Sequence, residues 1–150
     1  MESHAIASLV PHGGGMLWLE RLIAGDDNSV LAEALVGREH LFAQADGVPA
    51  WTGIEYMAQA IAAWAGLRAQ ARGQSAKPGF LLGTRRYDCS RAKFAFGLRL
   101  RIEARCELFG DNGLGMFACR LLDGVEEIAR ANLSVFEPPE AHASINEQTP

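Results

Sequence analysis

One hydrophobic helix pattern dominates the sequence. Residues 48–66 are almost all apolar or small, and the favourable first-turn proline Pro49 together with the stop signal Gly73 predicts a helix from about Pro49 to about Arg72. A helix that is apolar on all sides must be covered by the rest of the protein. We therefore expect the other elements of the chain to be built around this helix.

A single carboxylate interrupts the apolar pattern. Glu55 lies on this helix, and Gln59 follows four residues later, on the same helix face. A buried acid is costly unless it is paired, hydrogen-bonded or used in chemistry, so Glu55 is the first candidate for a functional residue. Thr52 and Glu55 also have the spacing of a capping box, so a helix that begins at Thr52 would give Glu55 a structural role only. We favour the earlier start at Pro49, because it leaves the carboxylate free.

The segments on either side of the helix have strand patterns. Residues 98–108 alternate strictly between apolar and mostly charged side chains, which predicts a strand with one buried and one solvated face. Turn sequences at residues 25–28 and 110–113 predict hairpins. The expected strands cover residues 16–23, 29–36, 80–87, 98–108, 114–122 and 125–136. Together they predict an α+β fold in which a curled antiparallel sheet of five to six strands wraps around the central helix.

Length and composition are those of one globular domain. We place this domain at residues 1–137 and expect the polar, patternless residues 138–150 to be a disordered tail. Neither a signal peptide nor a membrane span is recognisable, so the default location is the cytoplasm. The three cysteines are odd in number and widely spaced, which argues against a disulfide framework and against a metal site.

Charge is distributed unevenly along the chain. The net charge of −4 gives no electrostatic basis for nucleic-acid binding. Seven cations nevertheless fall in a span whose only acid is Asp88: Arg68, Arg72, Lys77, Arg85, Arg86, Arg91 and Lys93. Such a cluster would suit an acidic carrier protein or a phosphate-bearing ligand, and a solvated face accounts for it equally well.

Two segments resemble a known family. Residues 9–12 with 16–22, and residues 49–60 with the sequence Glu-Tyr-Met-Ala-Gln-Ala from Glu55 onward, are similar to the hotdog-fold 3-hydroxyacyl acyl-carrier-protein dehydratases of fatty acid synthesis, and especially to their aryl-polyene-type relatives. Residues 79–87 match more weakly, where the family has a strand. The likeness extends over roughly residues 6–137.

The resemblance implies dehydration of a 3-hydroxyacyl thioester to a trans-2-enoyl thioester. Substrates of this family are carried on acyl carrier protein or coenzyme A, no cofactor or metal takes part, and two subunits share each site, so we expect a homodimer or a heterodimer with another hotdog protein. Glu55 matches the carboxylate that protonates the departing hydroxyl. Ala50 falls where a backbone N–H polarises the thioester carbonyl, and Gln59 is expected to support Glu55 by a hydrogen bond.

The loop before the helix departs from the family pattern. His40 is the candidate for the base that takes the C2 proton, but residues 39–47 replace the usual Gly-His-Phe-Pro, and His40 lies one residue farther from Glu55. His12 matches a family histidine without a catalytic role and is expected to be supporting. Two alternatives stay open: a thioesterase in which Glu55 activates water, and a non-catalytic subunit that stabilises an active dehydratase partner.

Overall fold

The elements follow the predicted order of two strands, one helix and then antiparallel strands. The computed structural model describes residues 16–74 and 79–138. Its elements are β1 (Arg21–Gly25), β2 (Ser29–Leu35), β3 (Val48–Pro49), a 3-10 turn (Ala50–Thr52), α1 (Gly53–Ala71), β4 (Phe80–Cys89), β5 (Lys93–Phe94), β6 (Arg99–Phe109), β7 (Leu114–Asp123) and β8 (Glu126–Phe136). The short pair β3 and β5 was not predicted.

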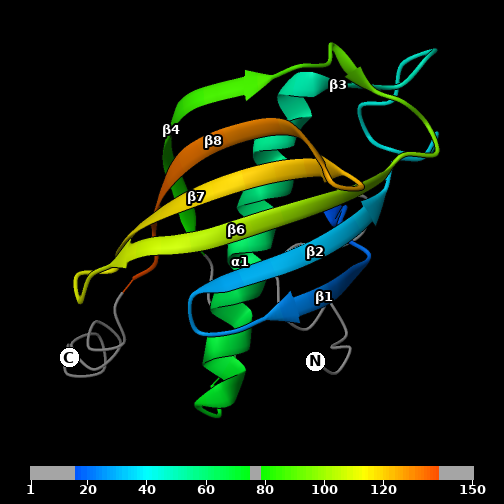
Figure 1. Ribbon diagram of the computed structural model, residues 1–150. Helices are drawn as coiled ribbons and strands as arrows, with labels where there is room; N and C mark the ends of the chain where they lie inside the picture. The colour runs from blue at the N-terminus through cyan, green and yellow to red at the C-terminus, as the bar shows by residue number, and fades with distance from the viewer. Residues whose placement is uncertain (1–15, 75–78, 139–150) are drawn as a thin grey trace, which may run out of the picture.

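Six strands form one antiparallel sheet in the order β1-β2-β6-β7-β8-β4, and α1 crosses one face of it (Figure 1). The predicted architecture, a curled antiparallel sheet around one long helix, is confirmed. The strand β4 precedes β6 in the sequence but pairs with β8, so β1 and β4 are the two edges of the sheet. The edge at β4 lies beside the N-terminal half of α1, which makes it part of the candidate site described below.

The core fills the space between α1 and the sheet. Tyr56, Met57 and Trp64 of the helix are fully buried, as are Ile102 of β6 and Phe117 of β7. The helix contacts β6, β2 and β7 in particular. Burial on the helix side of each strand follows the period-two pattern of the sequence, and the alternate residues face outward.

The first predicted strand begins later than expected. Residues 16–23 were predicted as a strand, but β1 starts at Arg21. The reason lies in the helix: the Met16 carbonyl and the Trp18 N–H are both hydrogen-bonded to the side chain of Gln59, so they take no part in a sheet ladder. A long-range contact thus overrides the local strand pattern.

The helix also begins later than expected. Pro49 belongs to β3, and after the 3-10 turn the α-helix starts at Gly53. The capping-box alternative is not realised, because the Thr52 hydroxyl donates to the Pro49 carbonyl (2.7 Å) and caps no helix N–H. At the other end Gly73 has a φ of 70°, the left-handed conformation of a helix stop that the sequence predicted.

Several predictions fall on residues outside the described ranges. These are the supporting role of His12, the docking role of Lys77 and the tail, of which residues 139–150 are not described. Within residues 16–74 and 79–138, no helix has both the length and the apolar character needed to cross a lipid bilayer.

Candidate active site

Glu55 faces an apolar groove between α1 and the β4 edge. The groove has a volume of about 140 Å³. Its helix wall is formed by Glu55 and by small residues at helical spacing, including Ala58 and Ala62, and its sheet wall includes Phe80 and Phe109. A carboxylate therefore lies at the surface of a narrow apolar channel, where an acyl chain could be accommodated beside it.

Gln59 fixes the position of Glu55. The Gln59 side chain is fully buried, its Nε2 donates to Glu55 Oε2 (2.8 Å) and to the Met16 carbonyl (2.6 Å), and its Oε1 accepts from the Trp18 N–H (2.9 Å). Both N–H groups and the carbonyl of the amide are thus used. The expected i, i+4 contact is present, and it holds one oxygen of Glu55.

Backbone contacts at the start of the helix occupy the predicted thioester donor. The Ala50 N–H donates to the Ala92 carbonyl (3.1 Å), and the Ala50 carbonyl accepts from the Tyr87 hydroxyl. The Ala50 amide would have to give up the first bond to polarise a thioester. The approach of Tyr87 depends on Gly53, since a Cβ at that position would overlap the Tyr87 hydroxyl.

His40 lies in the loop between β2 and β3, on an aromatic surface. Its ring centroid is 4.1 Å from that of Trp18 and 5.9 Å from that of Tyr56. Its Nδ1 accepts a hydrogen bond from the Phe42 N–H (3.0 Å), and its Nε2 is buried with no partner among the described residues. Burial lowers the pKa of His40 below its ordinary value, against a smaller opposing effect of Glu39.

This hydrogen bond determines where the imidazole proton lies. A neutral histidine whose Nδ1 accepts carries its hydrogen on Nε2, so His40 presents a donor and not a lone pair at its second nitrogen. To act as a base, the ring must exchange the Phe42 contact or rotate. The residues that line the Glu55 groove do not include His40, so the described chain does not bring the two predicted catalytic side chains into one groove.

The predicted cationic cluster is divided among separate places. Arg68 packs over the Trp64 ring near the end of α1, and Arg72 follows the last helical residue. Arg91 pairs with Asp123 (3.0 Å), and Lys93 pairs with Asp46 close to the start of the helix. Because the 19 residues of α1 span about 28 Å, the two groups lie at opposite ends of the molecule. Arg85 and Arg86 lie on β4 between them.

Sequence reasoning missed the residues that connect the site to the rest of the fold. The ring of Trp18 packs against His40 at a tilt and its N–H donates to Gln59, and Tyr87 holds the start of the helix. Gly53 offered one signal, since a glycine inside the helix predicted from Pro49 is unfavourable unless another group approaches the backbone closely. Nothing local in the sequence identifies Tyr87 as the group that approaches Gly53, or Trp18 as a partner of Gln59.

Comparison with known proteins supplies the family. The profile of the ApeP-like family, described as ApeP dehydratase, matches residues 4–146. The chain belongs to the ApeP-like dehydratase family. This confirms the resemblance predicted from the sequence. A search of curated proteins finds no match.

Solved structures agree with this family and with the hotdog fold. The structure titled "The Dehydratase Heterocomplex ApeI:P", from Xenorhabdus doucetiae, has a TM-score of 0.85 and 27% sequence identity, covering 97% of this chain and 99% of that chain. The PaaI protein of the E. coli phenylacetic acid degradation operon has a TM-score of 0.60 at 14% identity, with coverages of 77% and 81%. A hypothetical thioesterase from Streptococcus pneumoniae, solved with coenzyme A, has a TM-score of 0.58 at 14% identity, with coverages of 79% and 84%.

Proposed function

We propose that the chain dehydrates a 3-hydroxyacyl thioester to a trans-2-enoyl thioester as one subunit of a hotdog dimer. The observation that carries this proposal is Glu55, a carboxylate at an apolar groove whose orientation is fixed by the buried amide of Gln59. An acid beside an apolar channel suits a substrate with a long acyl chain and a polar reacting end. Membership of a dehydratase family supports the reaction class.

The proposed reaction assigns one proton transfer to each of two groups. A base removes the C2 proton, the C3–O bond breaks, and protonated Glu55 gives its proton to the departing hydroxyl, so that water leaves and a C2–C3 double bond forms. Gln59 donates to one oxygen of Glu55, and we assign the transferred proton to the other. The base is a histidine, for which His40 is the candidate in this chain, on condition that its Phe42 contact is exchanged.

A second subunit would complete the site. The β4 edge presents three consecutive exposed apolar residues, Phe80, Leu81 and Leu82, and the first two also line the Glu55 groove. An exposed apolar strand edge is the kind of surface that pairs with another chain. A partner bound there would lie against the groove and could supply a histidine, which the lining formed by the described residues does not contain. The match to a dehydratase heterocomplex supports another hotdog protein as that partner, and a second copy of this chain is the alternative.

The substrate would be an acyl carrier protein or coenzyme A thioester of fatty acid or aryl polyene synthesis. Two members of the predicted cluster, Arg68 and Arg72, lie near the C-terminal end of α1. Within the described residues, and in contrast to Arg91 and Lys93, neither of them forms an ion pair. An acidic carrier could dock on them. Arg85 and Arg86 remain further candidates, while Arg91 and Lys93 are already paired with acids.

A thioesterase is the second candidate function. The observation that favours it is the hydrogen bond from Phe42 to His40 Nδ1, which leaves His40 without a free lone pair. A thioesterase could use Glu55 alone to activate water, since hydrolysis of a thioester needs no proton to be taken from C2.

Product identity tests the proposal. The chain is purified with a co-expressed hotdog partner and incubated with a 3-hydroxyacyl coenzyme A thioester, and the products are identified by mass spectrometry. We expect the enoyl thioester. Free thiol with the hydroxy acid would establish the thioesterase instead. Turnover that depends on the partner alone, with no change when Glu55 is replaced, would leave this chain a non-catalytic subunit.

A further inference from the structure

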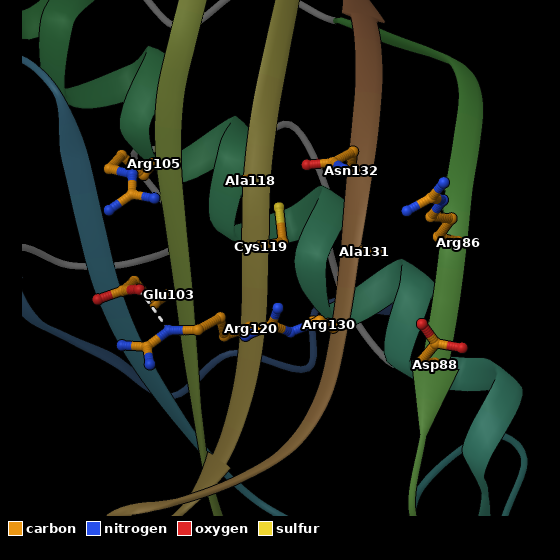
Figure 2. Close-up of a pocket in the computed structure, with 10 residues that line it drawn as sticks. All are labelled: Arg86, Asp88, Glu103, Arg105, Ala118, Cys119, Arg120, Arg130, Ala131 and Asn132. Carbon is orange, nitrogen blue, oxygen red and sulfur yellow. Dashed lines mark hydrogen bonds and ion pairs between the residues drawn. The ribbon is translucent and has the colours of Figure 1, made fainter.

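A second hollow lies on the outer face of the sheet, opposite α1 (Figure 2). Its volume is about 570 Å³, and its lining residues come from the four neighbouring strands β6, β7, β8 and β4. The helix is visible behind the strands in Figure 2, so this hollow and the Glu55 groove are separated by the sheet. A hollow of this size can accept a small molecule.

Strand register arranges the lining in two adjacent rows. In the first row Arg105 of β6 pairs with Ala118 of β7, and Ala118 pairs with Asn132 of β8. Asn132 in turn pairs with Arg85 of β4, beside Arg86. The side chain of Ala118 is small, so it leaves a depression in the middle of this row, and an arginine lies at each end of the row. Figure 2 shows Asn132 between Arg105 and Arg86, with the Arg86 guanidinium directed toward β8.

A backbone irregularity places Arg86 in the first row. The register of β4 against β8 shifts between Arg85 and Asp88, and Arg86 has a φ of 52°. This left-handed conformation is uncommon for a residue other than glycine and costs free energy. A bulge of this kind changes the direction of a side chain, and strained residues gather at functional sites. Here the result is an arginine facing the hollow.

The second row largely neutralises itself. Glu103, Arg120, Arg130 and Asp88 are successive register partners across the sheet. Arg120 Nε donates to Glu103 (2.7 Å), and Arg130 donates to Glu127 through Nε (2.7 Å) and a terminal nitrogen (3.0 Å). These arginines already have carboxylate partners, so they add little free charge to the hollow.

Arg86 and Arg105 differ from the second row. Neither forms an ion pair with any residue in the described part of the chain. The lining holds four arginines and two carboxylates, and Glu127, which pairs with Arg130, lowers the local net charge from +2 to +1, in a chain whose net charge is −4. The hollow is therefore a local positive site on an acidic protein. Asn132 adds a hydrogen-bond donor between the two arginines.

We propose that this hollow binds a phosphate group of a small-molecule ligand, over the row formed by Arg105, Ala118, Asn132 and Arg86. Guanidinium groups match the geometry of phosphate oxygens with paired hydrogen bonds. Asp88 and Glu103 lie on the second-row side, where they accept hydrogen bonds from hydroxyl or amino groups of the same ligand. The hollow, at about 570 Å³, has the size of a small-molecule site, which favours a phosphorylated small molecule over an acidic protein as the occupant.

This site is independent of the proposed dehydration. It lies on the opposite face of the sheet from Glu55, so phosphate binding is expected to be the same in a Glu55→Gln variant. If the protein binds phosphate but does not catalyse dehydration, only the proposed function fails. If it catalyses dehydration but does not bind phosphate at the hollow, only the present proposal fails.

The test is a titration of the full-length 15N-labelled chain with inorganic pyrophosphate, followed by two-dimensional NMR. We expect the signals of Arg105, Asn132 and Arg86 to shift. Arg105→Gln and Arg86→Gln should each weaken binding by about tenfold or more, the scale of a lost charge-assisted hydrogen bond. Arg38→Gln removes the same charge at an exposed position of the loop between β2 and β3, which does not line the hollow, and should leave the affinity unchanged.

Two further arms make the proposal falsifiable. Ala118→Leu fills the low point of the row without a change of charge, and it should weaken pyrophosphate binding as well. Adenosine monophosphate and polyglutamate distinguish a phosphorylated small molecule from an acidic polypeptide. An equal loss in Arg38→Gln, an unchanged affinity in Ala118→Leu, or tighter binding of polyglutamate than of pyrophosphate would each overturn the proposal.

Discussion

The two faces of one sheet carry opposite chemistry. On the helix side, the Glu55 groove is apolar, and the orientation of its carboxylate is fixed by a fully buried amide. On the outer side, the hollow is lined by arginines, two of which have no ion-pair partner among the described residues. The alternation of side chains along each strand separates the two, because adjacent residues point to opposite faces.

The comparison shows two ways of building a site. Glu55 gains its position from hydrogen bonds that also hold the first described segment against the helix, so its geometry is part of the stability of the fold. Arg86 gains its position from a local bulge at a sheet edge, which the core does not require. Substitutions in the first site should therefore affect folding and activity together, and those in the second should affect ligand binding with little loss of stability.

The largest expected effect on stability comes from Gln59→Leu. This change removes three hydrogen bonds and leaves the Met16 carbonyl, the Trp18 N–H and the Glu55 carboxylate without this partner. At roughly 1–3 kcal/mol for each buried group left unsatisfied, we expect a loss of about 2–5 kcal/mol in the free energy of unfolding, measured by urea denaturation. Gln44→Leu, the same change at an exposed position of the loop between β2 and β3, should change it by less than about 0.5 kcal/mol. Equal effects of the two changes would contradict the role of Gln59.

A smaller, pH-dependent effect is expected at His40. Its pKa in the folded chain is lowered by burial, so the unfolded chain takes up a proton first as the pH falls below the ordinary value of 6.5. The stabilising contribution of neutral His40 is therefore present above this pH and lost as the pH falls through the folded pKa.

The comparison variant for this effect is His40→Gln, which cannot titrate. The difference in unfolding free energy between the wild type and His40→Gln should shift in favour of the variant between pH 7.5 and pH 5.5. Urea denaturation at the two values measures it. A difference that stays constant, or that shifts toward the wild type at low pH, would show that His40 is not held neutral by its aromatic surroundings.

The smallest effect is expected at the outer site. Arg86→Gly relieves a left-handed conformation and should leave stability unchanged or raise it by up to about 1 kcal/mol, while Arg85→Gly, in the regular part of the strand, should lower it by about 0.5–1 kcal/mol. Thermal unfolding of the two variants gives the difference. If Arg86→Gly is the less stable of the two, the strain at Arg86 is not real.

Most of the fold could be predicted because its patterns are local. The long apolar helix, its glycine stop and the alternation in β6 each follow from the period of the side chains. The first strand could not be located correctly, because Met16 and Trp18 bind Gln59, more than 40 residues away. Likewise the helix start depends on Tyr87, which reaches Ala50 from another strand.

The sites were predictable to different degrees. The contact of Gln59 with Glu55 follows from their spacing on one helix. The surroundings of His40 do not, since its loop has no repeating pattern and its partners Trp18 and Tyr56 come from other elements. The outer hollow was beyond prediction for a third reason: the pairing of β4 with β8 is non-local, and the bulge that turns Arg86 toward Asn132 leaves no sequence signal.

The central claim is that Glu55 is the acid of the dehydration, and the rate of the Glu55→Gln variant tests it most directly. The variant keeps the size of the side chain and removes its proton-donating ability. With the same hotdog partner and the same 3-hydroxyacyl thioester as the wild type, it should form the enoyl product roughly 10²- to 10⁴-fold more slowly, the usual scale for loss of a general acid. An unchanged rate from a folded variant would contradict the claim.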